Sequence, residues 1–368
     1  MPKIVIVGGG IVGASFAYHA NLAGFTEITI LAEALPGDKS QATTNTWGWV
    51  NGYAANDKNY AAFRLANLKY WSQLIEYNNR LKKTSKGALF WDLSDTELKE
   101  TIIQHQNWGH SIKEVNQSEI DELLPNLFIK PINAAYGIND IAVEGSKVTS
   151  EFIKASGCKV LNVYVKKIIY EENTVIGVET DQGIIYTDEV IIAAGLGTPN
   201  LLSTLKINFK MHSSLGLLAY TKPLPELLLK YPITGADFHA RQDDKGRLVI
   251  GGKFDEDTSK EENIQEVAIK LVQEIATRLN YHSSITLDHY TLGIRPLPFD
   301  GRPKIGRLKN NQGENIKGVY IAVMHSGITN APLAGKLGIK EILTGKRDLL
   351  LSDFLPQSVF DNGNDNNV

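Results

Sequence analysis

The sequence of 368 residues predicts an α/β fold in which a discontinuous Rossmann-like domain is joined to a second α+β domain built on a mostly antiparallel sheet. Three observations support this prediction. A strand, a glycine-rich turn, a helix and a second strand follow one another within residues 3–33. Buried strands that end beside glycine return at residues 188–195 and 318–327. Residues 210–292 instead alternate short strands with turns, which is typical of an antiparallel sheet.

The first segment is a compact βαβ unit. Lys3–Val7 is a short β-branched run, as expected of a strand that is buried on both faces. A helix is predicted from Ile11 to Ala23, and Gly24 stands where a left-handed residue ends a helix. Glu27–Leu31 is the second strand. The order strand, turn, helix, strand is the one that dinucleotide-binding folds use.

The turn of this unit carries a phosphate-binding motif. It reads G-x-G-x-x-G over Gly8, Gly9, Gly10, Ile11, Val12 and Gly13. Gly8 allows the tight turn, Gly10 lets the backbone approach a pyrophosphate, and Gly13 lets helix and strand pack closely. The helix N-terminus adds free N–H groups and the positive end of its dipole. Glu33, 20 residues after Gly13, would accept hydrogen bonds from ribose hydroxyls. A dinucleotide is therefore expected here.

Further elements follow along the chain. Ser94 and Asp95, and then Asn116 or Ser118 before Glu119, predict two helix starts. Other predicted strands are Lys159–Ile169, Val175–Glu179, Asp188–Ala194 and Tyr320–Val323, and other predicted helices are Glu262–Asn280 and Pro332–Leu343, the last of them closed by Gly345. A basic cluster is expected in a solvated loop and comprises Arg80, Lys82, Lys83 and Lys86.

Composition limits the class of protein. Lysine and arginine total 38 and aspartate and glutamate total 41, so the net charge is −3. We expect no nucleic-acid partner, because proteins that neutralise phosphate backbones are strongly basic. The single cysteine, Cys158, excludes an intrachain disulfide, and no metal site is expected at His105 and His110. No secretory signal and no run of roughly 20 apolar residues is found, so we expect a cytoplasmic protein with no transmembrane segment.

The returning strands favour FAD over NAD. A simple NAD dehydrogenase would place its substrate domain after one contiguous nucleotide fold. In this chain the strand at 188–195 ends in glycine, and the strand at 318–327 leads through a loop into a helix. Such a discontinuous arrangement suits a cofactor long enough to be held at both ends.

We therefore expect two interleaved domains. An FAD-binding domain is predicted over residues 1–80, 141–208 and 294–350, and a substrate-binding domain over residues 81–140 and 209–293. Residues 361–368, rich in Asn and Asp, are expected to form a disordered tail.

Four segments, spread over nearly the whole chain, carry a family resemblance. They are the N-terminal glycine motif, the strand end at 194–195, residues 293–306 (GIRPLPFDGRPKIG) and residues 325–332 (HSGITNAP). With them the chain resembles the FAD-dependent D-amino-acid oxidase family, in particular its glycine oxidase and sarcosine oxidase branch. The third segment matches the pattern G-x-R-P-x-x-x-D-G-x-P-x-I-G of that branch without insertion or deletion.

The resemblance implies roles for individual residues. Arg295 matches the arginine that binds a substrate carboxylate, a task that suits a planar bidentate donor, and it is also expected beside the cofactor. His239, Arg241 and Trp49 are the other expected substrate contacts. Expected cofactor contacts, besides the motif and Glu33, are Thr43, Thr44, Asn45, Thr46, Val165, Ala194, Gly195, His325, Ser326, Gly327, Ile328 and Thr329. The last five precede the final helix, whose N-terminus would stabilise negative charge on a reduced flavin.

Departures from the family leave substrate and electron acceptor open. Val249 stands roughly where the sarcosine oxidase branch has a lysine linked to oxygen reactivity, and the loop before Ala331 is shorter than in glycine oxidase. No cysteine lies near Arg295 or His325, so FAD is expected to bind non-covalently.

The implied reaction is oxidation of an amine or amino acid that carries a carboxylate, with hydride transfer to flavin N5 and hydrolysis of the resulting imine. Oxygen or another electron acceptor would take the electrons, and no catalytic base is named because the flavin supplies the chemistry. Two alternatives stay open: an FAD-dependent 2-hydroxy-acid dehydrogenase, and a non-catalytic flavin-binding subunit of a larger oxidoreductase. The chain is also a possible homo-oligomer.

Overall fold

A computed structural model describes the chain except for residues 1, 253, 255–262, 282, 311 and 357–368. The chain divides into two compact units, each assembled from separate stretches of sequence. Unit 1 comprises Met1–Thr44, Ser146–Ser214 and Ile294–Val368, and unit 2 comprises Asn45–Gly145 and Leu215–Gly293. The predicted fold class, an interrupted Rossmann-like part with a second mostly antiparallel part, is confirmed.

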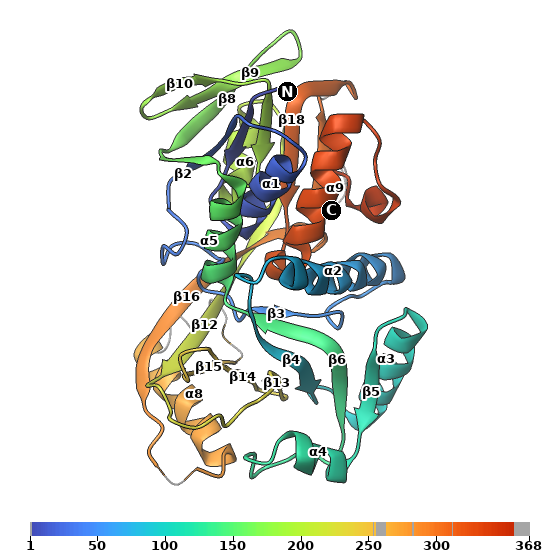
Figure 1. The fold of residues 1–368 in the computed structure, drawn as a ribbon, viewed down its shortest axis with the longest axis vertical. Helices are drawn as coiled ribbons and strands as arrows, with labels where there is room; N and C mark the ends of the chain where they lie inside the picture. The colour runs from blue at the N-terminus through green and yellow to red at the C-terminus, as the bar shows by residue number, and fades with distance from the viewer. Residues whose placement is uncertain (1, 253, 255–262, 282, 311, 357–368) are drawn as a thin grey trace, which may run out of the picture. The chain divides into compact units, whose positions relative to one another are not determined.

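Unit 1 is built on a sheet with a parallel centre (Figure 1). The central strands lie in the order β7-β2-β1-β11-β18, with bounds β1 (Ile4–Val7), β2 (Ile28–Ala32), β7 (Lys159–Asn162), β11 (Glu189–Ile192) and β18 (Asn315–Val323). All four contacts between neighbours in this series are parallel. Because β1 has β2 on one side and β11 on the other, successive connections run in opposite directions from it, which creates a topological switch point between β1 and β11.

Four further strands extend this sheet. They are β8 (Val165–Glu171), β9 (Thr174–Thr180), β10 (Gly183–Tyr186) and β17 (Lys304–Lys309). Strand β9 joins β18 in parallel, whereas β8 and β10 pair with β9, and β17 with β18, in antiparallel fashion. The predicted strand over 159–169 is therefore two strands, β7 and β8, which lie in different parts of the sheet. The turn between β8 and β9 uses Glu172 and Asn173 at positive φ.

Two helices of unit 1 pack against each other at close range (Figure 1). They are α1 (Ile11–Leu22) and α9 (Gly327–Thr344). A Cβ atom on Gly335 would lie 2.4 Å from Ser15 Oγ, and one on Gly338 would lie 2.6 Å from Phe16 Cε1. Glycine at these positions therefore lets the helices approach. The remaining helical segments of this unit are α5 (Gly145–Ser156), α6 (Thr198–Ser203), η1 (Gly195–Gly197) and η2 (Leu349–Phe354).

Unit 2 contains a mostly antiparallel sheet in the order β16-β12-β15-β14-β13-β4-β6-β3, with β5 beside β6. One contact, between β13 and β4, is parallel. The strands are β3 (Trp49–Val50), β4 (Lys83–Phe90), β5 (Ile112–Val115), β6 (Ala134–Val143), β12 (Met211–Thr221), β13 (Ile233–Thr234), β14 (Phe238–Gln242), β15 (Leu248–Gly252) and β16 (Leu287–Pro298).

Helices bury the apolar residues of this sheet. They are α2 (Lys58–Tyr77), α3 (Asp95–Asn107), α4 (Gln117–Leu123) and α8 (Ile264–Arg278). Leu271 and Ile275 of α8 share a core with Leu217, Ala219 and Ile250 of the sheet. None of the described helices is long and apolar enough to cross a membrane.

Some expected boundaries differ from those observed. Residues 45–80 belong to unit 2, because β3 pairs with β6 and α2 contacts β6. Lys83 and Lys86, expected in a loop, lie in β4, where side chains at the N-terminal end of the strand are exposed or half-buried. The final helix starts at Gly327 and contains Pro332 in its interior. The expected tail at 361–368 lies outside the described residues.

Candidate active site

The glycine turn lies at the switch point of the unit 1 sheet. Gly8 follows β1 with φ of 120°, and a Cβ atom there would lie 2.2 Å from the carbonyl oxygen of Ala193. Ala193 and Ala194 follow β11, so the carboxyl ends of the two strands meet at this point. Ligands of open α/β sheets bind outside the carboxyl ends of the strands at such a switch point.

The three motif glycines serve different purposes. A Cβ atom on Gly13 would lie 2.0 Å from the carbonyl oxygen of Gly8, so this glycine is required by the packing of α1 on the turn. A Cβ atom on Gly10 would contact only the Thr43 hydroxyl, at 3.1 Å. Packing therefore does not demand glycine at position 10. The space beside it fits the close approach of a pyrophosphate to the backbone.

The two long helices of unit 1 begin side by side. A Cβ atom on Gly327 would lie 3.4 Å from Ile11 Cγ2 and 3.5 Å from Val12 Cγ2. Ser326, the N-cap of α9, has a left-handed backbone with φ of 55°, and no side chain caps the helix there. Two positive helix ends thus converge on one region, which favours an anionic ligand.

The neighbouring loops contribute hydroxyl groups. Thr43 Oγ1 accepts a hydrogen bond of 3.1 Å from the amide of Ile11, the first residue of α1. Thr44 Oγ1 is buried and has no hydrogen-bond partner among the described residues. A buried hydroxyl in this condition fits a ligand-facing role. Asn45 and Thr46, predicted with them, already belong to unit 2, where Thr46 Oγ1 accepts from the amide of Gly48 at 3.3 Å.

Glu33, predicted to contact a ribose, lies at the end of β2. Its side chain is exposed and directly follows the strand. Asn162, at the end of β7, donates through Nδ2 to the carbonyl oxygens of Ala32 and Glu33 at 3.0 and 2.8 Å. Sequence reasoning missed Asn162, since its partner lies 129 residues away. Val165 is buried in the core with Val7, so its backbone is the part that could reach a cofactor.

Arg295 lies on β16 close to the switch point. A Cβ atom on Gly195, which follows β11, would lie 3.9 Å from Cγ of the adjacent Pro296. Arg295 Nη1 donates to Ser214 Oγ at 3.4 Å. Burial lowers the pKa of Arg295, because desolvation disfavours the cation. An arginine stays charged in proteins, so this partly buried guanidinium favours an anionic ligand.

The loop before α9 is also ordered by side chains. His325 Nδ1 and Ser326 Oγ lie 2.9 Å apart. Ile328 and Thr329 are buried in the first turn, whereas His325, Ser326 and Gly327 are half-buried. These three residues are the accessible part of the predicted cofactor loop.

The two predicted substrate contacts on β14 of unit 2, His239 and Arg241, have different surroundings. The rings of His239 and Trp47 lie 4.5 Å apart and tilted. Arg241 is instead buried among protein groups: its guanidinium lies 2.6 Å from Glu144 Oε1 and 3.2 Å from Oε2, and Nε donates to the carbonyl oxygen of Trp47 at 2.6 Å. Arg241 therefore anchors the backbone of Trp47, and the interpretation of Arg241 as a substrate contact is replaced by this role.

Trp49 lies on β3 within an aromatic group. Its ring centroid is 5.4 Å from Trp47, 6.0 Å from Tyr53 and 6.1 Å from Phe90. The indole N–H donates to Asp140 Oδ2 at 3.1 Å. Half-buried, Trp49 keeps part of its surface available to a ligand.

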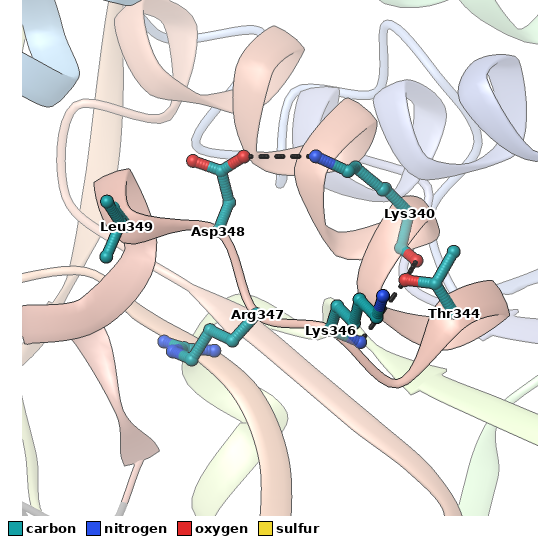
Figure 2. Close-up of a pocket in the computed structure, with 6 residues that line it drawn as sticks. All are labelled: Lys340, Thr344, Lys346, Arg347, Asp348 and Leu349. Carbon is teal, nitrogen blue, oxygen red and sulfur yellow. Dashed lines mark hydrogen bonds and ion pairs between the residues drawn. The ribbon is translucent and has the colours of Figure 1, made fainter.

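A separate hollow of about 630 Å³ lies on the surface at the C-terminal end of α9 (Figure 2). It is lined by Lys340, Thr344, Lys346, Arg347, Asp348 and Leu349. Lys340 Nζ lies 3.3 Å from Asp348 Oδ2, and Arg347 Nη1 lies 2.9 Å from Glu341 Oε2. The hollow contains none of the predicted site residues. Within the described ranges, no group of three or more His, Cys, Asp or Glu residues could hold a metal ion.

The switch point, the glycine turn and the paired helix ends together define a dinucleotide-binding protein. The chain belongs to the DAO family, described as FAD dependent oxidoreductase, whose model matches residues 3–340. The predicted cofactor, non-covalently bound FAD, agrees with this family, and the resemblance to its glycine oxidase branch is confirmed.

Relatives match over nearly the full chain. An uncharacterized oxidoreductase of Bacillus subtilis (strain 168), YurR, is 23% identical over 381 residues, covering 97% of this chain and 99% of the relative. A glycine oxidase of Bacillus licheniformis is 23% identical over 363 residues, covering 92% of each chain. The crystal structure of L-proline dehydrogenase from P. horikoshii has the same fold, with a TM-score of 0.82, 21% identity and 96% of each chain covered.

Proposed function

We propose that this protein oxidises an amine or amino acid that carries a carboxylate. The substrate loses a hydride from the carbon that bears nitrogen and a proton from the nitrogen, and the imine that results is hydrolysed by water to a carbonyl compound and ammonia or an amine. FAD supplies the two-electron acceptor for the hydride. The protein's own residues bind and orient the substrate.

The position of Arg295 carries this proposal. Its guanidinium is partly desolvated on the strand whose next residue, Pro296, lies near Gly195 at the switch point. A planar fork of donors binds a carboxylate through two parallel hydrogen bonds. Such an anchor at one end of a small substrate fixes the direction of its reacting C–H bond, and orientation accounts for much of the rate in reactions of this kind.

The start of α9 supports the redox part of the proposal. The first-turn N–H groups of α9 and the half-buried His325 stand at the positive end of the helix dipole. Fixed donors of this kind stabilise negative charge that develops during a reaction without reorganising. In the proposal they hold the negative charge that two-electron reduction leaves on the cofactor.

The relatives support the class of substrate. The names of the glycine oxidase and the L-proline dehydrogenase each give an amino acid as substrate. Both compounds carry a carboxylate, which is the group that Arg295 is proposed to bind. One relative is named an oxidase and the other a dehydrogenase. The two names therefore do not select between oxygen and another electron acceptor for this chain.

A substrate panel tests the reaction class. The purified protein with FAD is mixed without oxygen with glycine, sarcosine, proline, D-amino acids and 2-hydroxy acids, and loss of flavin absorbance is followed. We expect bleaching by at least one amine or amino acid. Bleaching by hydroxy acids alone would select the hydroxy-acid dehydrogenase, and no bleaching by any compound would favour a non-catalytic subunit.

Replacing Arg295 by Lys tests the proposed anchor. Lysine keeps the charge and loses the bidentate geometry, so we expect KM for the reactive amino acid to rise roughly 10- to 100-fold, as expected for the loss of a charge-assisted hydrogen bond. FAD content measured by absorbance should stay the same. An unchanged KM would remove Arg295 from the substrate site.

A further inference from the structure

Unit 2 contains a buried polar network made of Trp49, Asn51, Arg64, His110 and Asp140. We propose that this network is a positioning device for the segment 49–51, and that Asp140, His110 and Arg64 are positioning residues for Trp49. The proposal rests on the function proposed above, in which Trp49 contacts substrate.

Asp140 connects the indole of Trp49 to a buried histidine. Its carboxylate accepts from Trp49 Nε1 at 3.1 Å through Oδ2 and from His110 Nε2 at 3.2 Å through Oδ1. The side chains of His110 and Asp140 are 1% and 0% exposed. In the described part of the chain, His110 Nδ1 has no hydrogen-bond partner. The side-chain hydrogen bonding of His110 is therefore directed at Asp140.

Two glycines make room for this pair. A Cβ atom on Gly137 would lie 2.7 Å from Asp140 Oδ2, and one on Gly52 would lie 3.0 Å from His110 Nε2. Neither glycine has a positive φ, so backbone conformation does not explain them. The space at Gly137 is filled by the Asp140 carboxylate, and the space at Gly52 by the His110 imidazole together with Leu65, whose Cδ2 would lie 2.7 Å from the added Cβ.

Arg64 holds the backbone on the other side of Trp49. This residue of α2 is completely buried, and it donates through Nε to the carbonyl oxygen of Asn51 at 3.1 Å and through Nη2 to Asn51 Oδ1 at 2.7 Å. Asn51 Nδ2 in turn donates to the carbonyl oxygen of Trp49 at 3.3 Å. The segment is thus fixed through its backbone and through its indole ring.

The free-energy cost of burying Arg64 and Asp140 indicates that these residues orient Trp49 and do not primarily stabilise the fold. Burying a carboxylate and a guanidinium costs several kcal/mol each by the usual estimates, and an apolar replacement of such groups is often no less stable. Arg64 and Asp140 are fully buried, and among the described residues Arg64 donates only to neutral oxygens. The strand β3 is only two residues long. Its backbone hydrogen bonds to β6 alone therefore leave the ring of Trp49 weakly oriented. Directional hydrogen bonds from both sides supply that orientation.

An indole resonance measures the proposal directly. The chain has five tryptophans, and the holoenzyme labelled with ¹⁵N-tryptophan reports each indole N–H separately. The Trp49→Phe variant assigns the Trp49 resonance. In Asp140→Asn, which keeps the shape but loses the charged acceptor, we expect that resonance to shift while the others stay in place. An unmoved Trp49 resonance would overturn the proposal, whatever the substrate proves to be.

Kinetics with a matched control measure the consequence. Displacing a positioning group by about 1 Å can cost on the order of 100-fold in rate, so Asp140→Asn should lower kcat/KM for the reactive amino acid at least tenfold with FAD content unchanged. Glu341→Gln is the control, because Glu341 is a buried carboxylate of unit 1 that accepts from Tyr320 at 2.8 Å and Arg347 at 2.9 Å. It should lose stability without losing kcat/KM.

Two variants of His110 distinguish a loss of positioning from a loss of folding. His110→Gln retains a donor at the end of the side chain, whereas His110→Leu removes it, so the first should keep most of the activity and the second should behave like Asp140→Asn. Equal activity of the two His110 variants, or an equal loss of kcat/KM in Glu341→Gln, would contradict the proposal. If wild-type protein reduces its flavin with no amine or amino acid, the proposed function fails, and the indole resonance still decides the role of Asp140.

Discussion

His19 is a buried histidine of unit 1. It lies inside α1, 4% exposed, with Nδ1 donating to the carbonyl oxygen of Ser15 at 2.7 Å. The pKa of His19 is lowered from 6.5 to about 4, mainly because burial disfavours the imidazolium. The hydrogen bond to the Ser15 carbonyl opposes this effect, and the charge of Lys336 adds to it. The folded protein therefore keeps this histidine neutral at a pH where the unfolded chain protonates it.

This gives a prediction for stability against pH. Between pH 6.5 and about 4 the unfolded state binds a proton that the folded state excludes, so the free energy of unfolding falls as the pH falls through this window. Full traversal of the window costs on the order of 3 kcal/mol for His19. Urea unfolding of the FAD-saturated protein at pH 7 and pH 5 measures the difference.

The control is His19→Gln, which has no titrating ring. Its loss of stability from pH 7 to pH 5 should be smaller than that of the wild type. His105, whose pKa is also lowered to about 4 by burial, remains in both proteins and contributes equally to each. Identical pH slopes for the two proteins would exclude His19 as a source of acid sensitivity.

Arg295 and Arg241 show how far the role of a single residue can be predicted from its sequence context. Arg295 and Arg241 were both predicted at the substrate, and their sequence contexts do not tell them apart. The partner of Arg241 is Glu144, which is 97 residues away in the chain. Ion pairs over such separations depend on the sheet that brings β14 and the end of β6 together, so no local pattern reveals them.

At the scale of elements, the sequence predicted the ends of a helix correctly where a nearby side chain caps the helix. Ser94 with Glu97 and Asn116 with Glu119 form capping boxes at the predicted starts of α3 and α4. Gly345 ends α9 in a left-handed conformation. The final helix was predicted to begin at Pro332, whereas it begins at Gly327 and contains Pro332 in its interior.

Two of the motif glycines, Gly10 at the N-cap of α1 and Gly13 within the helix, give a prediction for this element. In Gly13→Ala the new methyl group would lie 2.0 Å from the Gly8 carbonyl oxygen, so helix and turn must move apart, and both stability and FAD binding should fall. In Gly10→Ala the methyl group meets only Thr43 Oγ1 at 3.1 Å. Stability of the FAD-free protein should then change by less than about 1 kcal/mol, while FAD affinity falls at least tenfold.

Melting curves of FAD-free protein and titrations with FAD separate these outcomes. The two variants serve as controls for each other, since both add one methyl group to the same turn. If Gly10→Ala bound FAD as tightly as the wild type, the pyrophosphate would not approach the backbone at this residue.

At the scale of the whole molecule, unit 1 is assembled from three separate stretches of chain. The predicted cofactor contacts come from all three, for example Gly10, Ala194 and Ser326. A ligand that binds only the folded state stabilises it by mass action, by about 2.7 kcal/mol at a concentration 100 times Kd. Bound FAD is therefore expected to stabilise the folded state of unit 1 through contacts with all three stretches of chain.

Removal of FAD should lower Tm by several degrees, and added FAD should restore it. Scanning calorimetry of FAD-free protein over a range of FAD concentrations measures this effect. NAD at the same concentrations is the control and should leave Tm unchanged, because the site is proposed to hold the flavin dinucleotide. A rise in Tm with NAD and none with FAD would contradict the cofactor assignment.

The sequence by itself determined the local parts of this protein: the glycine motif, the strand and helix that surround it, the capped helices, and the family to which they belong. These follow from short-range sterics and hydrogen bonds that a few neighbouring residues specify. Only the tertiary structure decided that residues 45–80 join unit 2, that Arg241 pairs with Glu144, and that Asp140 holds Trp49. Each of these depends on strand pairing between distant stretches, where the decisive neighbour is close in space and remote in the chain.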